Sequence, residues 1–268
     1  MLKPCVLGAD WHTAKVRGFI WGDSNSQHLY HLLHPVAARE GIAIATIFPC
    51  PAVVDIDHLR YDAPTMPIYN QSCTTIRHRL LEYLQKSPDI GLVILAASWT
   101  TLPWNVASPA NEKRSPAGGI KLIGDALDRL LPQLERPGRR VILFADFPNI
   151  VPSYAMGRSE KLTDPVACVL ATSKLLRRPC DLDQEAWRNF EQYGLPVHTA
   201  LRQALARHPG VVGHFPEDYL CEPGKCRTWL GDEFLYRDSN HIRRNLRPAT
   251  VEAFDELLKI KQMLTGAE

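Results

Sequence analysis

Two short stretches of the sequence carry residue types that could cooperate in nucleophilic chemistry. In WGDSNSQHLY, Ser24 follows an apolar run, Val16–Trp21, and precedes a segment with helical spacing. In LYRDSNHI, Asp238 stands three residues before His241. A serine nucleophile needs a base, and the base needs a group that orients its ring, so the two stretches together supply all three roles.

Each stretch also has a purely structural interpretation. Ser24 could be a helix N-cap, because Ser and Asp are favoured at that position. Asp238 and its polar neighbours could cap the last helix, with His241 a nearby surface residue. A short motif alone carries a high risk of a false match. GDS after the first strand and D-x-x-H before the last helix are more specific together, so we predict Ser24 as nucleophile, His241 as general base and Asp238 as its orienting carboxylate.

The rest of the chain alternates apolar strands with helical segments. This alternation is typical of a mostly parallel sheet covered on both faces, and ligands of such sheets bind at the carboxyl ends of the strands, where Ser24 lies. We predict one α/β domain over residues 1–268, a three-layer α/β/α sandwich, with a possible inserted cap at 147–183. The predicted strands are 16–21, 42–48, 90–97, 141–145 and 211–215, and the predicted helices are 27–39, 74–85, 120–134, 184–208 and 249–264.

Composition excludes several classes of protein. With 268 residues and 45% hydrophobic residues, the chain can bury a large core. Its net charge of +2 gives no field that would attract nucleic acid, so we predict no nucleic-acid partner. The apolar runs are far too short to span a membrane, and the first residues lack a signal-peptide core. We therefore expect either a cytosolic protein or part of a larger exported or membrane-bound one. We also expect no metal and no organic cofactor.

The seven cysteines leave two alternatives open, reduced thiols in a cytosolic enzyme or disulfides in an oxidising compartment. Two of them bracket a short loop, CEPGKC, which a disulfide closes easily and which offers too few ligands for zinc. Two others flank the Pro-rich segment after the second predicted strand, and a bridge there could pin that segment near Ser24. We favour disulfides, two with better support, a weaker third and one cysteine left over: Cys221–Cys226, Cys50–Cys73, Cys168–Cys180 and Cys5.

The GDS block near the start and the D-x-x-H block near the end resemble those of SGNH (GDSL-type) hydrolases. More narrowly, VRGFIWGDSNS preceded by Cys5, ILAASW, and CRTWLGDEFLYRDSNHI preceded by Cys221 are similar to the SGNH domain fused to acyltransferase-3 membrane proteins. The resemblance spans most of the chain. It implies a periplasmic α/β/α domain that O-acetylates a surface glycan, such as lipopolysaccharide O-antigen. It also implies that a membrane acyltransferase domain, in the same native chain, delivers the acyl group.

The chain departs from the family pattern around the oxyanion hole. SGNH enzymes usually contribute a Gly from a second block and a Gly-x-Asn-Asp motif from a third, and neither is present. The remaining candidates are the backbone N–H of Ser24, and Asn70 and Ser98 at the positions where the missing blocks would lie. Since one lost oxyanion donor typically lowers the rate by a factor of about a hundred or more, we expect a slow enzyme as an isolated domain.

Three further residues are candidates for substrate binding: Trp99 as a stacking surface, and Arg243 and Arg244 as a basic rim on the first turns of the last helix. Their structural alternatives are a packed Trp and a solvated helix face. The function we predict is an O-acyltransferase that moves acetyl through acyl-Ser24 to a glycan hydroxyl. A carbohydrate acetylesterase and a catalytically weak glycan-binding module are the alternatives.

Overall fold

Six strands form the central sheet in the order β1-β3-β2-β4-β5-β6. The computed structural model describes residues 5–47, 50–56, 66–109, 113–150, 165–170 and 181–267. Neighbouring strands pair in parallel, except that β1 pairs antiparallel with β3 at one edge. The strands are β1 (Val6–Gly8), β2 (Val16–Gly22), β3 (Ile42–Ile47), β4 (Ile90–Ala96), β5 (Arg140–Phe144) and β6 (Val211–His214).

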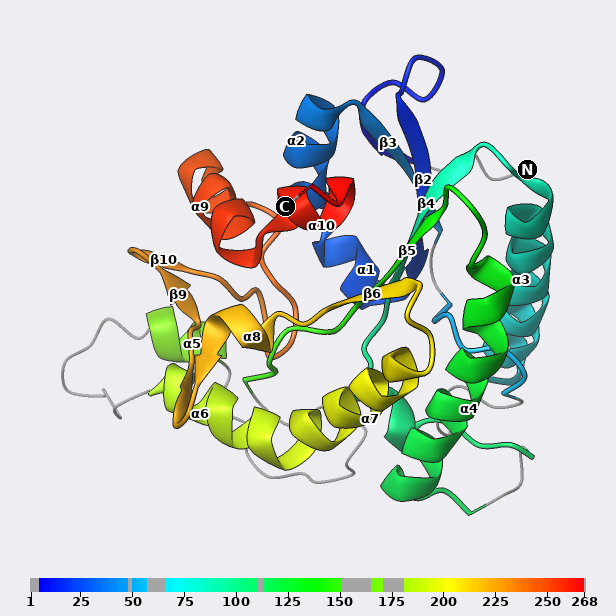
Figure 1. Cartoon of the computed structure of the whole chain (residues 1–268). Helices are drawn as coiled ribbons and strands as arrows, with labels where there is room; N and C mark the ends of the chain where they lie inside the picture. The colour runs from blue at the N-terminus through cyan, green and yellow to red at the C-terminus, as the bar shows by residue number, and fades with distance from the viewer. Residues whose placement is uncertain are drawn as a thin grey trace.

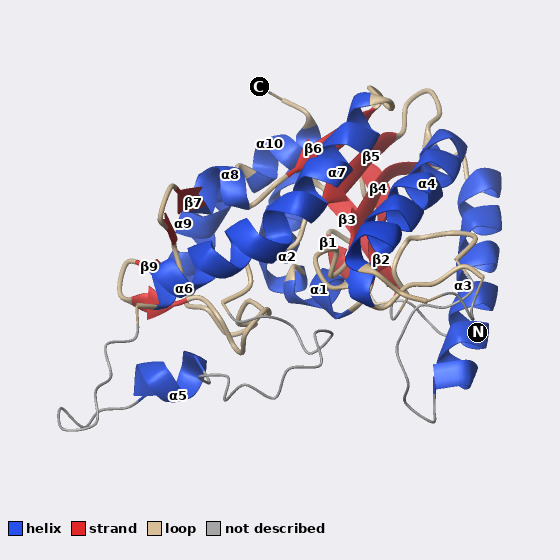
Figure 2. Cartoon of the chain, turned by 90° about the horizontal axis from the view of Figure 1, so that it is seen from below, coloured by secondary structure: helices blue, strands red, loops and turns tan. Residues whose placement is uncertain are grey.

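Helices cover both faces of this sheet, with α2, α9 and α10 on one side and α3, α4 and α7 on the other (Figure 1). A π-helical turn, η3, joins α6 to α7, and the two helices follow one another beside the sheet (Figure 2). The helical elements are α1 (Ser24–His28), α2 (Tyr30–Glu40), α3 (Met66–Lys86), η1 (Leu102–Trp104), α4 (Pro116–Leu134), α5 (Pro165–Leu170), α6 (Leu182–Asn189), η3 (Phe190–Gly194), α7 (Leu195–Ala206), α8 (Glu217–Leu220), α9 (Pro248–Leu258) and α10 (Ile260–Thr265).

The predicted three-layer α/β fold is confirmed, because each apolar run became a strand buried between two apolar layers. Some predicted boundaries are wrong. The last helix is two helices, since Lys259 takes a left-handed conformation between α9 and α10. Residues 66–72, which the sequence pattern predicted as loop, belong to α3, which begins at Met66. Two short hairpins, β7–β8 (Cys221–Glu222, Lys225–Cys226) and β9–β10 (Trp229–Leu230, Glu233–Phe234), were not predicted.

The prediction of a single domain stays a prediction. Most of the predicted cap at 147–183 lies outside the described residues, which include α5 and the start of α6 from this region.

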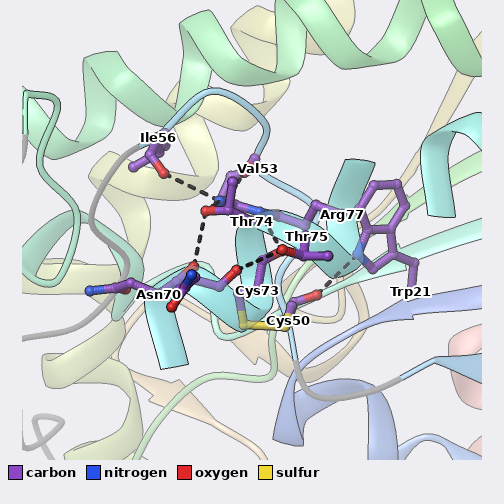
Figure 3. Close-up of a disulfide and its surroundings, with 10 residues drawn as sticks. Trp21, Cys50, Val53, Ile56, Asn70, Cys73, Thr74, Thr75 and Arg77 are labelled. Carbon is purple, nitrogen blue, oxygen red and sulfur yellow. Dashed lines mark hydrogen bonds between the residues drawn. A yellow bond between two sulfur atoms is a disulfide. The ribbon is translucent and has the colours of Figure 1, made fainter. Parts of the chain in front are cut away.

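Both better-supported disulfides, Cys50–Cys73 and Cys221–Cys226, are present. The first joins the segment after β3 to α3 (Figure 3). On one side of it the Trp21 indole N–H donates to the Cys50 carbonyl at 3.0 Å, and on the other the buried Arg77 guanidinium donates to the carbonyls of residues 53 and 56 (Figure 3). Because Trp21 lies in β2, three residues before Ser24, the bridge fixes this segment beside the strand that carries Ser24.

The other cysteine predictions are only partly covered. The Cys168–Cys180 pair includes Cys180, which lies outside the described residues. Cys5 is exposed and carries a free thiol.

We predict that the double variant Cys50→Ala/Cys73→Ala loses about 3 kcal/mol of unfolding free energy, because the bridge closes a loop with a sequence separation of 23. Urea unfolding monitored by circular dichroism measures this loss. Cys5→Ala is the matched control, since it removes a free thiol and no cross-link. Equal stability of the double variant and the control would contradict the prediction.

Candidate active site

Ser24 lies at the first position of α1, directly after β2. Gly22 ends the strand so close to β4 that a Cβ there would lie 1.6 Å from the Ala96 carbonyl oxygen, so only glycine fits. Asp23 then turns the chain: it is the N-cap of α1, and its carboxylate accepts the N–H of Asn25 at 2.9 Å. The N-cap of this helix is therefore Asp23 and not Ser24, which leaves the Ser24 hydroxyl available for another role.

The two predicted motifs meet at the carboxyl end of β2. His241 Nε2 lies 3.0 Å from Ser24 Oγ, and His241 Nδ1 lies 2.9 Å from Asp238 Oδ1. The Asp238 carboxylate also accepts the backbone N–H groups of Asn240 and His241 within the same turn. Since α9 begins only at Pro248, Asp238 orients His241 and does not cap the last helix. A hydroxyl, an imidazole and a carboxylate in this order can activate the hydroxyl for attack on a carbonyl carbon.

The electrostatics of the carboxylate suit this arrangement. Partial burial would raise the pKa of Asp238, but the hydrogen bonds from the His241 ring and from the backbone outweigh it and lower that pKa well below its ordinary value. Arg237 adds a further cation beside Asp238, 3.1 Å from its Oδ2. Asp238 is therefore ionised at neutral pH and can stabilise a positive charge on His241.

Buried groups support the loop that carries His241. The Ile242 N–H donates to His28 Nδ1 at 3.2 Å, and the rings of His28 and His241 meet edge to face, with centroids 5.7 Å apart. Burial, with His241 nearby, lowers the pKa of His28 well below its ordinary value, so this ring stays neutral and accepts the bond. The buried Tyr236 hydroxyl donates to the Pro148 carbonyl at 2.7 Å. These buried contacts therefore hold the loop that carries His241 in place.

The three oxyanion candidates differ in position. The backbone N–H of Ser24 belongs to the first turn of α1, where a helix offers no internal acceptor. The N–H of Ser98 donates to both carboxylate oxygens of Asp23, at 3.0 and 3.1 Å, so that group is already engaged. Asn70 lies on α3, where its carbonyl accepts the Thr74 hydroxyl near the Cys50–Cys73 bridge (Figure 3). Of the three, the N–H of Ser24 is the one placed at the nucleophile.

The carboxylate of Asp146 anchors the end of β4 from the neighbouring strand. It follows β5 and accepts both the N–H of Thr100, at 3.0 Å, and the Thr100 hydroxyl. Its other oxygen lies 3.0 Å from His198 Nε2, and the second ring nitrogen of His198 lies 2.9 Å from Glu217 Oε1. Because Thr100 lies two residues after Ser98, this buried cluster also fixes the loop after β4, in which the Ser98 N–H donates to Asp23.

His198 carries a proton in this cluster. Complete burial alone would lower its pKa, but the hydrogen bond that the ring donates to Asp146 and the negative charges of Asp146 and Glu217 outweigh burial and raise the pKa of His198 to about 9. Arg202 balances the second carboxylate, with its guanidinium 2.9 Å from Glu217. The cluster is therefore a buried, charged scaffold.

The predicted substrate-binding residues need correction. Trp99 is fully buried and its indole N–H donates to the Phe144 carbonyl at 2.8 Å, so it packs in the core and offers no face to a substrate. Arg243 and Arg244 lie in the loop before α9, not on its first turns. Arg243 is half-buried and bonds the Phe234 carbonyl, while Arg244 is exposed beside Gln27, 2.7 Å away. Arg244 therefore lies at the surface beside α1, where its role in substrate binding stays a prediction, and Arg243 supports the loop before α9.

Sequence reasoning missed Asp23, Asp146 and His28 as supports of the site. Asp23 was visible in the GDS motif, and Asp146 follows the predicted strand VILFA at the end where ligands bind, so position gave a signal for both. His28 gave none, because its role depends on the buried contact with a loop 214 residues away.

A family model described as SGNH domain (fused to AT3 domains) matches residues 2–245. The chain belongs to this SGNH family. Its candidate triad falls inside the matched region, at both ends of it. No curated protein sequence matched the chain.

Membership sets the general chemistry of this SGNH domain, because SGNH hydrolases are esterases and acyltransferases. The family's fusion to AT3 domains fits an extracytoplasmic domain that works beside a membrane acyltransferase. In the described part of the chain, we find no helix with the length and apolarity needed to cross a membrane.

We predict that Asp23→Ala lowers the unfolding free energy by about 2 kcal/mol, because it removes a helix cap and leaves the buried Ser98 N–H without an acceptor. Urea unfolding gives the stability, and amide hydrogen exchange at Ser98 reports the contact itself. Asp23→Asn, which keeps one acceptor oxygen, should be intermediate. Unchanged protection of the Ser98 amide in Asp23→Ala would show that the contact does not hold this loop.

The His198 cluster predicts a pH-dependent stability. A pKa of about 9 in the folded chain against 6.5 as the ordinary value stabilises the fold by about 3 kcal/mol below pH 6.5, and this contribution is lost as the pH rises through about 9. The stability gap between the wild type and His198→Gln should therefore shrink over this window. Urea unfolding from pH 6 to 9.5 measures it, with exposed His12→Gln as control. Parallel profiles of the wild type and His198→Gln would refute the assignment.

Proposed function

We propose that this SGNH domain transfers an acetyl group through an acyl-Ser24 intermediate to a hydroxyl of a bacterial cell-surface glycan, on the periplasmic side of the inner membrane. The observation that carries the proposal is the alignment of Ser24 Oγ, His241 and Asp238 within hydrogen-bond distances of 3.0 and 2.9 Å. The family's fusion to AT3 domains supports delivery of the acetyl group by a membrane acyltransferase domain. Two disulfides support an oxidising compartment.

The proposed reaction has two halves. Ser24 Oγ attacks the acetyl carbonyl of the donor while His241 Nε2 takes the hydroxyl proton, and the oxyanion faces the Ser24 N–H. Collapse expels the donor's leaving group with the proton from His241 and leaves acetyl-Ser24. A glycan hydroxyl, deprotonated by His241, then attacks the acetyl carbon, and the proton returns to Ser24 as the O-acetyl glycan departs. Asp238 stabilises the imidazolium in both halves.

Two alternatives each have an observation in their favour. If water takes the place of the sugar in the second half, the domain is an acetylesterase, and the half-buried position of Ser24 gives water access. If catalysis has been lost, the domain is a glycan-binding module, and the engagement of the Ser98 N–H by Asp23 removes one possible oxyanion donor. A fluorophosphonate probe separates enzyme from module, because an active serine should be labelled at Ser24 and only with His241 intact.

We predict that Ser24→Ala lowers the rate at which the domain hydrolyses a chromogenic acetyl ester at least about a thousandfold, because the acyl-enzyme cannot form. Ser115→Ala is the matched control, since it removes a true N-cap serine from α4 and should keep the activity. Adding glycan acceptors to the wild type should divert acetyl from water to sugar. A folded wild type without Ser24-dependent turnover would instead favour the binding module.

A further inference from the structure

The loop that carries His241 contacts α1 at Ser24 and again about one turn later. His241 Nε2 lies 3.0 Å from Ser24 Oγ, at the first residue of α1. Three residues further along the helix, Gln27 Oε1 accepts a hydrogen bond from Arg244 Nη2 at 2.7 Å. Residues three apart on a helix are neighbours on its surface, with Cβ atoms about 5–6 Å apart. Gln27 therefore attaches Arg244 to the part of α1 that adjoins the nucleophile.

The four arginines of residues 237–247 differ in their partners. Three are engaged by acids or by a carbonyl: Arg237 with Asp238, Arg243 with the Phe234 carbonyl, and Arg247 with Asp232 and Glu233. Arg244 is exposed, and within the described ranges it is in no ion pair and donates to the uncharged Gln27 amide. An arginine has five N–H donors, and this bond uses one of them. Arg244 therefore presents an unneutralised positive charge and further N–H donors to solvent.

The bond to Gln27 orients the planar guanidinium of Arg244. A guanidinium matches a carboxylate or a phosphate, because either anion can accept two parallel N–H bonds from it. The neighbouring His31 does not add to this charge. Burial, and then the positive charge of Arg244, lower the pKa of His31 to about 4, so its ring is neutral at neutral pH. The surface around Gln27 therefore suits one anionic group of a ligand.

We propose that Arg244, oriented by Gln27, binds an anionic group of the substrate, a carboxylate or a phosphate, while the reacting group of that substrate is held at Ser24. The proposal rests on the proposed function and deepens it, because it states the charge of a molecule that donates or accepts the acetyl group. The anionic group belongs either to the acceptor sugar or to the acetyl donor, and the test separates the two. Arg244 is then a specificity-determining residue that takes no part in proton transfer.

Binding is measured on the full chain as its Ser24→Ala variant, labelled with ¹⁵N, so that no turnover occurs. Two pairs of ligands that differ in one carboxylate are titrated at low ionic strength: methyl β-D-glucopyranosiduronate with methyl β-D-glucopyranoside, and 4-acetoxy-3-nitrobenzoate with 2-nitrophenyl acetate. α-D-Glucose 1-phosphate tests the phosphate. The backbone amide signal of Gln27 should shift and saturate with at least one anionic ligand and not with the neutral ones. Added NaCl should weaken this binding, because salt screens an exposed charge.

Variants in the same background connect the shift to Arg244. Arg244→Gln should weaken binding of the anionic ligand about threefold or more, and Arg244→Lys, which keeps the charge but loses the planar fork, should be intermediate. Arg188→Gln is the matched control, because Arg188 is also exposed and also donates to a glutamine, Gln184 Oε1, at 2.8 Å, but lies on α6. No saturable shift with any anion, equal shifts with charged and neutral ligands, or equal binding by Arg244→Gln and Arg188→Gln would overturn the proposal.

Kinetics with Ser24 intact identify which substrate carries the anion. If it is the donor, Arg244→Gln lowers kcat/KM for 4-acetoxy-3-nitrobenzoate about threefold or more relative to kcat/KM for 2-nitrophenyl acetate. If it is the acceptor, Arg244→Gln instead lowers, by a similar factor, the ratio of acetyl transfer to the charged sugars over transfer to the neutral glycoside. Anion binding without Ser24-dependent turnover keeps the anion site and refutes the transferase. Turnover in which neither ratio depends on Arg244 keeps the enzyme and refutes the anion site.

Discussion

The Asp23 carboxylate is the contact on which the geometry of the candidate site depends. It caps α1 through the Asn25 N–H and at the same time accepts the Ser98 N–H from the loop after β4. One side chain thus fixes the start of the helix that presents Ser24 and attaches it to the neighbouring strand. The loop after β4 is held in turn by Asp146 through Thr100. The ends of β2, β4 and β5 therefore form one connected support, and His241 reaches Ser24 from the opposite end of the sequence.

Two histidines of this domain are each paired with an aspartate, yet the groups beside their second ring nitrogens differ. His198 lies between Asp146 and Glu217, so a carboxylate occupies each ring nitrogen and the proton is retained up to a pKa of about 9. His241 has a carboxylate on Nδ1 only, and its Nε2 faces the neutral Ser24 hydroxyl. A base that must take up and release a proton needs that uncharged partner. The second carboxylate is thus what separates a structural histidine from a candidate catalytic one.

The sequence was most informative where chemistry is carried by local spacing. The five parallel strands followed from continuous apolar runs, whereas the antiparallel edge strand β1 was not predicted. The meeting of Ser24 with His241 followed from motif order and from the rule that strand ends gather at one edge. Local pattern failed where long-range packing decides. Trp99 became a core residue because its indole finds a carbonyl on β5, and Asn70 joined α3 although its neighbours resembled a loop. The contact between Asn149 and Asn189 was equally invisible, since the two residues meet only through the fold.

Oxyanion stabilisation does not decide whether a sugar or water attacks acetyl-Ser24 in the proposed reaction. Attack by either nucleophile on acetyl-Ser24 passes through the same tetrahedral arrangement, so a weak oxyanion hole slows transfer and hydrolysis alike. A preference for sugar must come from an interaction that water does not make, and holding the acceptor in place is the largest such effect available, because it makes the attack effectively intramolecular. Ser24 is open enough for water to enter, with water vastly more abundant. The acceptor must therefore be bound beside Ser24 by contacts that outlast the acyl-enzyme.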